Sequence, residues 1–431
     1  MIIVDTALNA REAEGRPIRV GMIGSGFMAR GVANQIVNTS PGMRLAVVYG
    51  RRLDAAAGVF EYAGSAEPVT VGTIDQLDAA IAEGRPAITD DPLLVCRSRT
   101  VDAILDVTGA VELGAHVALE AFEHGKPLIL MNAELDATLG PILQVRARAK
   151  GVLMSACDGD QPAVQVNLFR FVRGLGLIPR VLGNIKGLQD PYRTPETQRG
   201  FAERWGQKPS MVTSFADGSK VSFEQAVVAN ATGMTVAKRG MLGLQHDGHV
   251  DQLTTRYDLE MLRAAGGIVD YVVGAQPGPG VFCLAEHPDP KQRHYLNLYK
   301  LGEGPLYSFY TPYHLCHFEA PTTIARTVLF GDVAAAPAGR PRVEVCAVAK
   351  RDLAAGEVLD DYGHFMTYGE AVSAEERVNG RYLPEGLVEG CRLVRSIPRD
   401  AVLTYDDVTL PSGRLADTLY AEQFAHFGGG G

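Results

Sequence analysis

The chain has 431 residues, of which 46 % are hydrophobic and 21 % are charged, a composition typical of a globular protein with a well-filled core. This excludes a disordered or fibrous chain, and at about 150 residues per domain the length predicts roughly three units. The formal net charge of −9 gives no overall positive field for nucleic acid or an anionic membrane. We therefore expect neither as a partner, although a local basic pocket could bind a small anionic substrate.

No apolar run reaches the ~18 residues that a membrane span needs. Residues 1–5 have neither the basic segment nor the long apolar stretch of a secretory signal. The six cysteines are widely spread, and no pair has CxxC spacing, which favours buried, reduced thiols. These features together predict a cytoplasmic protein.

The N-terminal third has the pattern of a dinucleotide-binding domain. A short helical arm over residues 1–16 precedes a strand-like run at 18–23, a GSGFMA motif at 24–29 and apolar residues at helical spacing. Glycines in such a motif permit a tight turn and close backbone approach, and the helix N-terminus faces the pyrophosphate. The residues expected to bind the cofactor here are Gly24, Gly26, Phe27, Met28 and Ala29.

The second strand, at residues 45–49, indicates which cofactor is used. It ends in Gly50, Arg51 and Arg52, where an NAD enzyme usually offers an acidic residue to the ribose 2′-hydroxyl. Two arginines instead suit the 2′-phosphate of NADPH. A solvated arginine pair at a strand end is the alternative, and the upstream fingerprint favours NADPH.

Two further strand ends extend the expected cofactor edge. The run at 101–107 leads to Thr108 and Gly109, and the run at 128–131 leads to Asn132 and Glu134. The nicotinamide lies at this carboxyl edge in doubly wound sheets. Asn132 and Glu134 could equally cap the helix that follows them.

The alternating rhythm stops after residues 151–154, where a different domain begins. Asp160 and Pro162 open a helix that runs to about Arg173, a strand follows at 181–187, and a helix at 322–330 returns to the first domain. We predict an α/β protein with a Rossmann NADP-binding domain, a central α+β catalytic domain and a small β-clip domain. The expected ranges are 1–16 for the helical arm, 17–155, 156–335 and 336–420 for the three domains, and 421–431 for a flexible tail.

Candidate catalytic residues cluster in the central segment. Hydride transfer to a carbonyl needs a proton donor and fixed positive charge, and Lys186, at a strand end, is the first choice for the donor. Asp158, Asp160 and Glu224 are acids that could bind a divalent Mg or Mn ion, although their spacing is no metal signature, and Asp160 could simply cap its helix. His314 and His317 could face one site if their segment is helical. The candidate substrate-binding residues are Arg193, Lys220, Lys238, Arg239 and Tyr313, with helix-dipole pairing as the alternative for Lys238 and Arg239.

Five stretches carry a resemblance to a known family. Residues 351–359 and 403–408 resemble a SAF (β-clip) domain, and residues 183–187, 214–233 and 310–318 resemble homoserine dehydrogenase-like oxidoreductases that carry such a domain at the C-terminus. One branch of that family is similar to 1-deoxy-D-xylulose-5-phosphate reductoisomerase and makes 2-C-methyl-D-erythritol 4-phosphate, an isoprenoid precursor, with NADPH.

The resemblance implies an NADPH-dependent oxidoreductase, with reductoisomerisation as the first expectation and a homodimer or larger homo-oligomer as the assembly. It also supports an active-site role for Lys186. Homoserine dehydrogenase, or another sugar, aldonate or aldehyde dehydrogenase, is the alternative activity. A cofactor-sensing or scaffold protein is the alternative that is not an enzyme.

Overall fold

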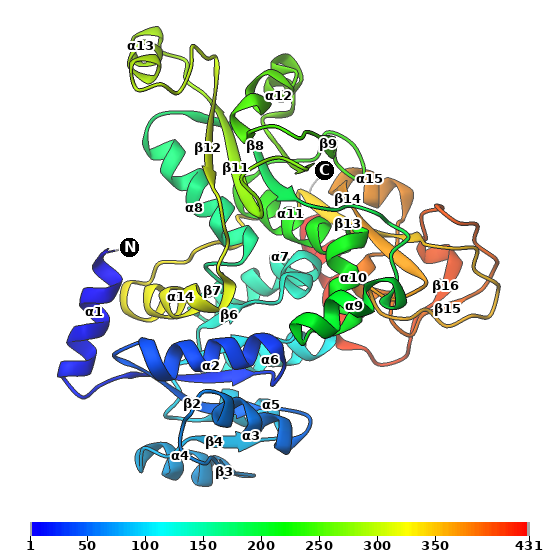
Figure 1. Cartoon of the computed structure of the whole chain (residues 1–431). Helices are drawn as coiled ribbons and strands as arrows, with labels where there is room; N and C mark the ends of the chain where they lie inside the picture. Colours follow the sequence, from blue (N-terminus) through cyan, green and yellow to red (C-terminus); the bar gives the residue numbers. More distant parts are fainter. Residues whose placement is uncertain (1, 429–431) are drawn as a thin grey trace.

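The computed structural model describes residues 2–428, and its N-terminal part is a doubly wound parallel sheet (Figure 1). Its seven strands lie in the order β3-β4-β2-β1-β5-β6-β7, and every pairing is parallel. The strands are β1 (Ile18–Ile23), β2 (Met43–Tyr49), β3 (Val69–Thr70), β4 (Ala87–Thr89), β5 (Ala103–Asp106), β6 (Leu128–Leu130) and β7 (Met154–Ala156). The expected Rossmann architecture is thereby confirmed.

The helices of this domain follow from the sequence pattern around each strand. Strand β1 is apolar almost throughout because β2 and β5 flank it and helices cover both faces. Within β1, Gly21 lets helix α5 pack closely, since a Cβ there would collide with Val95. The helices are α1 (Ile2–Ala13), α2 (Phe27–Thr39), α3 (Leu53–Tyr62), α4 (Ile74–Ala82), α5 (Pro92–Arg97), α6 (Val111–Glu123) and α7 (Ala133–Ala149).

The middle of the chain forms a second, mixed sheet in the order β12-β11-β8-β10-β9. Its strands are β8 (Ile178–Lys186), β9 (Leu244–Gln245), β10 (Ile268–Val273), β11 (Gly280–Glu286) and β12 (Leu306–Thr311). The accompanying helices are α8 (Gln161–Gly174), α9 (Pro195–Trp205), α10 (Pro209–Asp217), α11 (Ser219–Thr232), the 3₁₀ turn η1 (Val250–Thr255), α12 (Leu259–Ala265), α13 (Pro290–Leu298) and α14 (Cys316–Phe330). Helix α14 packs on α2 of the first domain, as the sequence predicted for residues 322–330.

The C-terminal part holds two small antiparallel sheets that lie beside both other parts (Figure 1). Its elements are β13 (Val343–Ala349), β14 (Thr367–Ser373), α15 (Ala374–Gly380), η2 (Glu385–Leu387), β15 (Arg392–Leu393), η3 (Tyr405–Asp407), β16 (Val408–Thr409) and α16 (Leu415–Gly428). None of the helices within residues 2–428 is long and apolar enough to span a membrane.

Helix α16 corrects the expectation of a flexible tail from residue 421. The helix continues to Gly428 because it packs on α6 and α7. Its Gln423 is buried and replaces a helical hydrogen bond of α7: it accepts from the backbone N–H of Ile142 at 3.1 Å and donates to the carbonyl of Thr138 at 3.2 Å. Residues 429–431, the rest of the expected tail, lie outside the described residues.

Candidate active site

The candidate site begins at the crevice where the strand order of the parallel sheet reverses, between β1 and β5. Ligands of open α/β sheets bind outside the carboxyl ends of the strands at such a point. Gly24 follows β1 with a φ of 120°, and a Cβ there would lie 3.0 Å from the side chain of Val107 and 3.2 Å from that of Thr108. Only glycine therefore permits the two loops to meet at this crevice.

The residues of the fingerprint fit a dinucleotide. No atom lies within 4 Å of the position of a Cβ on Gly26, so the backbone there is open to a ligand. Helix α2 begins at Phe27 without a side-chain cap on its first N–H groups, which leaves these donors for a pyrophosphate. Ala29 departs from the expectation, because its methyl group is fully buried in the core of the domain, and Met28 packs against the same core.

The two arginines after β2 differ in their surroundings. Arg52 is exposed and forms an ion pair with Asp54. Arg51 is also exposed, and among residues 2–428 it has no hydrogen-bond or ion-pair partner. Arg51 is therefore the freer of the two to bind a 2′-phosphate.

The loops after β5 and β6 are tied together by Asn132. Its side-chain oxygen caps α7 by accepting from the N–H of Leu135 at 3.0 Å. Its amide donates to the buried carboxylate of Asp106 at 2.8 Å and to the carbonyl of Ala110 at 3.1 Å. Asp106 also accepts from the Thr108 hydroxyl at 2.7 Å, and burial raises the pKa of Asp106. Of the two roles considered for Asn132, the structure shows the helix cap.

Glu134 links this edge to the central domain. Its side chain is fully buried, and Oε1 accepts from the Lys220 ammonium at 2.8 Å. Its other oxygen, Oε2, has no hydrogen-bond partner among the described residues. Burial lowers the pKa of Lys220, but the charges of Glu134, Asp160 and Glu224 outweigh it and raise this pKa above its ordinary value. Lys220 is thus a fixed positive charge.

Lys186 is close enough to Glu224 for the charge of Glu224 to influence its pKa. Its ammonium donates to the carbonyl of Phe215 at 2.7 Å. Burial lowers the pKa of Lys186, and the charges of Glu224 and Asp217 oppose this change. Burial and the charge of Asp160 raise the pKa of Glu224. The cluster therefore combines one permanently charged lysine with one that can lose its proton more easily than usual.

A chain of neutral polar groups connects Glu224 to helix α14. The Asn184 amide donates to Glu224 at 3.0 Å, and the Gln161 amide lies 3.1 Å from the Asn184 oxygen and 3.3 Å from Nε2 of His314. The other ring nitrogen of His314 lies 3.6 Å from the Cys316 sulfur. Burial lowers the pKa of His314, while the charge of Asp160 opposes this.

Asp160 combines two features. It caps α8 by accepting from the N–H of Gln161 at 3.1 Å, as the sequence predicted. It also lies close enough to Lys220, Glu224 and His314 to influence the pKa of each of them. Asp160 is therefore both a helix cap and a charge of the cluster.

Asp158 is not part of this cluster. Its carboxylate accepts from the buried Arg326 guanidinium at 2.9 and 3.0 Å and from the Thr323 hydroxyl at 3.0 Å. These bonds hold α14 against the start of α8. The catalytic expectation for Asp158 is corrected, because its oxygens are engaged by a structural ion pair.

The two histidines do not face one site. Helix α14 begins at Cys316, so His314 precedes it, and His317 packs against Gly31 of α2, where a Cβ would lie 2.8 Å from its ring. Tyr313 is 53 % exposed, and no contact with another residue of the range 2–428 places it in the cluster.

Three expected substrate-binding cations make no contact with the cluster among the described residues. Arg193 pairs with Asp190 at 2.9 Å, and Arg239 pairs with Glu370 of β14 at 2.8 Å. Lys238 is exposed. Helix α11 ends at Thr232, so neither Lys238 nor Arg239 lies in its last turn, and the helix-dipole alternative is wrong.

Sequence reasoning missed Gln161 and Asn184 as site residues, and it missed the hydrogen bond from Tyr362 to Gly109. Asn184 had a local signal, since it lies two positions before Lys186 on a strand and therefore on the same face. Gln161 follows the predicted cap of α8. Tyr362 lies in the C-terminal domain, and no local pattern connects it to the crevice.

No group of three or more histidine, cysteine, aspartate or glutamate side chains that could hold a metal ion occurs within the described part of the chain.

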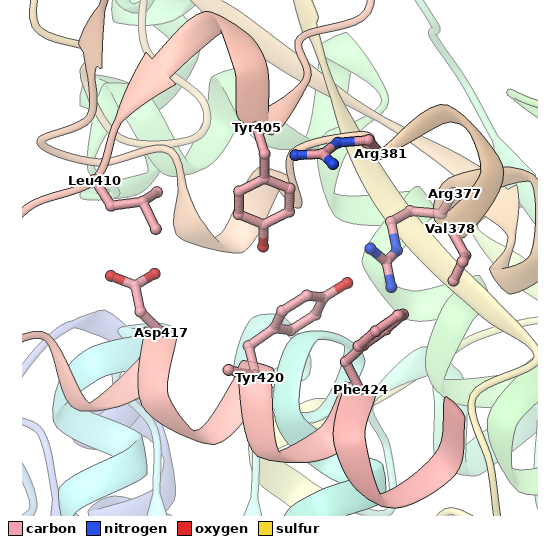
Figure 2. Close-up of a pocket in the computed structure, with 9 residues that line it drawn as sticks. Arg377, Val378, Arg381, Tyr405, Leu410, Asp417, Tyr420 and Phe424 are labelled. Carbon is pink, nitrogen blue, oxygen red and sulfur yellow. The ribbon is translucent and has the colours of Figure 1, made fainter. Parts of the chain in front are cut away.

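Two cavities, of about 310 and 410 Å³, flank Arg377 in the C-terminal domain. Figure 2 shows that Tyr405, Tyr420 and Phe424 surround the first one. Each charged residue of its lining is paired with a residue outside the lining: Arg377 with Glu344, Arg381 with Asp406 and Asp417 with Arg414.

A doubly wound parallel sheet beside a segment that matches an oxidoreductase family is the arrangement of a nicotinamide-dependent oxidoreductase. Residues 159–320 match the family described as "Oxidoreductase DRL, catalytic domain". The match covers the segment that contributes Lys186, Lys220 and Glu224, and it ends before the stretches at residues 351–359 and 403–408. No curated protein sequence matches the chain significantly.

Several solved structures share parts of the fold. A probable dehydrogenase from Thermotoga maritima has 12 % identity over 74 % of this chain and 90 % of its own, with a TM-score of 0.43. The 3-ketoreductase KijD10 from Actinomadura kijaniata has 14 % identity over 74 % of this chain and 91 % of its own, with a TM-score of 0.37. Biliverdin reductase from Synechocystis has 19 % identity over 40 % of this chain and 48 % of its own, with a TM-score of 0.28. At these values the likeness carries no conclusion about substrate.

Proposed function

We propose that this protein is an NADPH-dependent oxidoreductase that interconverts a carbonyl group and an alcohol on a small anionic substrate. The observation that carries the proposal is the buried ion pair between Glu134 and Lys220. It joins the cofactor edge of the Rossmann domain to the segment that matches an oxidoreductase catalytic domain.

The chemistry assigns different tasks to the two lysines. NADPH, when bound, supplies the hydride to the carbonyl carbon, so negative charge develops on the carbonyl oxygen. Lys220, held by Glu134 and permanently charged, stabilises that oxygen. Lys186, whose pKa is lowered by burial, donates the proton that completes the alcohol.

Arg51 supports NADPH over NADH as the cofactor, because it is exposed beside the end of β2 with no partner in the described chain. In fluorescence titrations, we expect Arg51→Asp to raise the Kd of NADPH at least about tenfold, as for loss of a hydrogen bond between charged groups. The Kd of NADH should change little, because NADH has no 2′-phosphate.

Arg52→Asp is the matched control, since Arg52 is already paired with Asp54. It should raise the Kd of NADPH less than Arg51→Asp does. If both variants bind NADPH as tightly as the unmodified chain, the assignment of the 2′-phosphate to Arg51 is wrong.

The resemblance of residues 183–187, 214–233 and 310–318 makes 1-deoxy-D-xylulose 5-phosphate the first substrate to test. Formation of 2-C-methyl-D-erythritol 4-phosphate with consumption of NADPH, measured by mass spectrometry and absorbance, would establish the reductoisomerase. Homoserine with NADP is the parallel assay for the alternative activity. Added Mg²⁺ or Mn²⁺ in each assay tests the metal requirement separately.

A further inference from the structure

The C-terminal domain reaches the cofactor crevice through residues 360–366, which precede β14. The Tyr362 hydroxyl donates to the carbonyl of Gly109 at 3.0 Å, in the loop that follows β5. The Tyr362 ring packs edge-on against Phe223 of α11, with a centroid separation of 5.7 Å and an interplanar angle of 77°. The Tyr362 side chain therefore contacts both the loop after β5, at the expected cofactor edge, and helix α11, which carries Lys220 and Glu224.

Tyr362 and the unpartnered oxygen of Glu134 both lie near the Gly109 turn. A Cβ on Gly109, whose φ is 73°, would lie 2.9 Å from the Tyr362 hydroxyl and 3.7 Å from Oε2 of Glu134. Both oxygens therefore face the same side of the Gly109 turn. The negative charge of Glu134 adds to burial in raising the pKa of Tyr362, so the hydroxyl stays a proton donor.

The loop that carries Tyr362 is held firmly. The carboxylate of Asp360 accepts from the N–H groups of Phe365 at 2.9 Å and Met366 at 3.2 Å. The buried ammonium of Lys350 donates to the carbonyl of His364 at 2.8 Å. Gly363 packs so closely against the backbone of Ser210 that a side chain would not fit. These contacts leave Tyr362 little freedom to withdraw from Gly109.

We infer that the C-terminal domain completes the cofactor site, with Tyr362 as a positioning residue that fixes the Gly109 turn for the nicotinamide end of the dinucleotide. The inference rests on the proposed function, since it assumes that NADPH binds in this crevice. The C-terminal domain then contributes to the cofactor site through the loop of Tyr362, and neither of its two cavities is involved.

The test is Tyr362→Phe, which keeps the ring on Phe223 and removes only the hydrogen bond to Gly109. We expect the Kd of NADPH to rise about fivefold, as for the loss of one neutral hydrogen bond. Hydrogen–deuterium exchange of the peptide covering residues 107–111 should also become about fivefold faster without cofactor. The second measurement needs neither activity nor NADPH.

Tyr257→Phe is the matched control. Tyr257 and Tyr362 are each 8 % exposed, and the Tyr257 hydroxyl donates to Asp270 at 2.8 Å in the central domain. This variant should lower the Tm without changing the Kd of NADPH or the exchange of residues 107–111. An unchanged Kd in Tyr362→Phe, or an equal rise in Tyr257→Phe, overturns the inference. An unmodified chain that binds no NADPH overturns the proposed function instead.

Discussion

At the scale of single residues, burial and nearby carboxylates together set the pKa of each lysine in the site. Lys186 and Lys220 both lie near Glu224, yet the pKa of one is lowered and that of the other is raised. The difference arises because Lys220 has a direct carboxylate partner in Glu134, whereas the hydrogen bond of Lys186 goes to the neutral carbonyl of Phe215. A protein can therefore use two lysines of one cluster for different tasks.

This difference predicts the pH dependence of the reaction. Reduction requires the protonated form of Lys186, so the rate of reduction should fall as the pH rises through its lowered pKa, well below the ordinary value near 10.5. Lys186→Met should reduce kcat about 100-fold or more and remove this falling limb. Steady-state kinetics from neutral to strongly alkaline pH measures both effects.

Lys291→Met is the control for that experiment, because Lys291 is an exposed residue at the start of α13. It should leave the pH profile unchanged. A falling limb that persists in Lys186→Met would show that another group donates the proton.

At the scale of the element, helix α7 packs against helices from all three parts of the molecule. It begins at the cofactor edge and contacts α6, α11 and α16. Pro141 interrupts its hydrogen bonding, and Gln423 from α16 replaces part of what is lost. The carboxylate of Asp136 occupies the space beside Gly140, where any side chain would collide with it.

We predict that the free energy of unfolding depends on pH because of the buried carboxyl group of Asp136. Both of its oxygens lack hydrogen-bond partners within residues 2–428, and burial raises its pKa from 3.8 to about 7. The folded state therefore binds the proton more tightly than the unfolded state, so stability decreases as the pH rises from about 4 to about 7 and then stays constant. The slope from this group is at most about 1.4 kcal/mol per pH unit.

Asp136→Asn lacks this group, so its free energy of unfolding relative to the unmodified chain should increase over the same interval. Urea unfolding at several pH values across and above that interval measures the difference. Parallel pH curves for the two proteins would contradict the assignment.

Helix α7 and the elements around it show how far the sequence could predict the structure. Strands β1, β2, β5, β6 and β8, the GSGFMA turn, the cap at Asp160 and the start of α7 follow from local patterns, and they were predicted close to where they occur. Strands β10, β11 and β12 of the central sheet were not predicted. The pairing of Glu134 with Lys220 joins positions 86 residues apart, and the helical continuation of α16 depends on its contact with α7. No periodicity encodes such contacts, because they depend on which faces meet after folding.

At the scale of the whole molecule, the C-terminal domain connects the other two. It contacts the Rossmann domain through α16, where Glu112 accepts from the N–H groups of Leu415 and Ala416 at 2.9 and 2.8 Å. It contacts the central domain through Ser219 and Ser222, whose hydroxyls bond to the backbone of Gly369 at 2.9 Å. These hydrogen bonds hold the C-terminal domain in contact with both the Rossmann domain and the central domain.

Lys350 forms a buried ion pair between the C-terminal domain and the central domain. Its ammonium is 2 % exposed and pairs with the fully buried carboxylate of Asp217 at 2.9 Å. It also donates to the carbonyls of Arg193 at 2.9 Å and His364 at 2.8 Å. Lys350→Met should lower the free energy of unfolding by about 3–5 kcal/mol, because it leaves the carboxylate of Asp217 buried without its counter-charge.

The adjacent Arg351 supplies the control, since its ion pair with Glu357 is exposed. Arg351→Met should cost no more than about 1 kcal/mol, and urea unfolding of both variants measures the contrast. Because Lys350 also holds the loop of Tyr362, Lys350→Met should weaken NADPH binding at temperatures where the chain is still folded, and Arg351→Met should not. Equal effects of the two variants on stability and on the Kd of NADPH would mean that the C-terminal domain does not brace the site through Lys350.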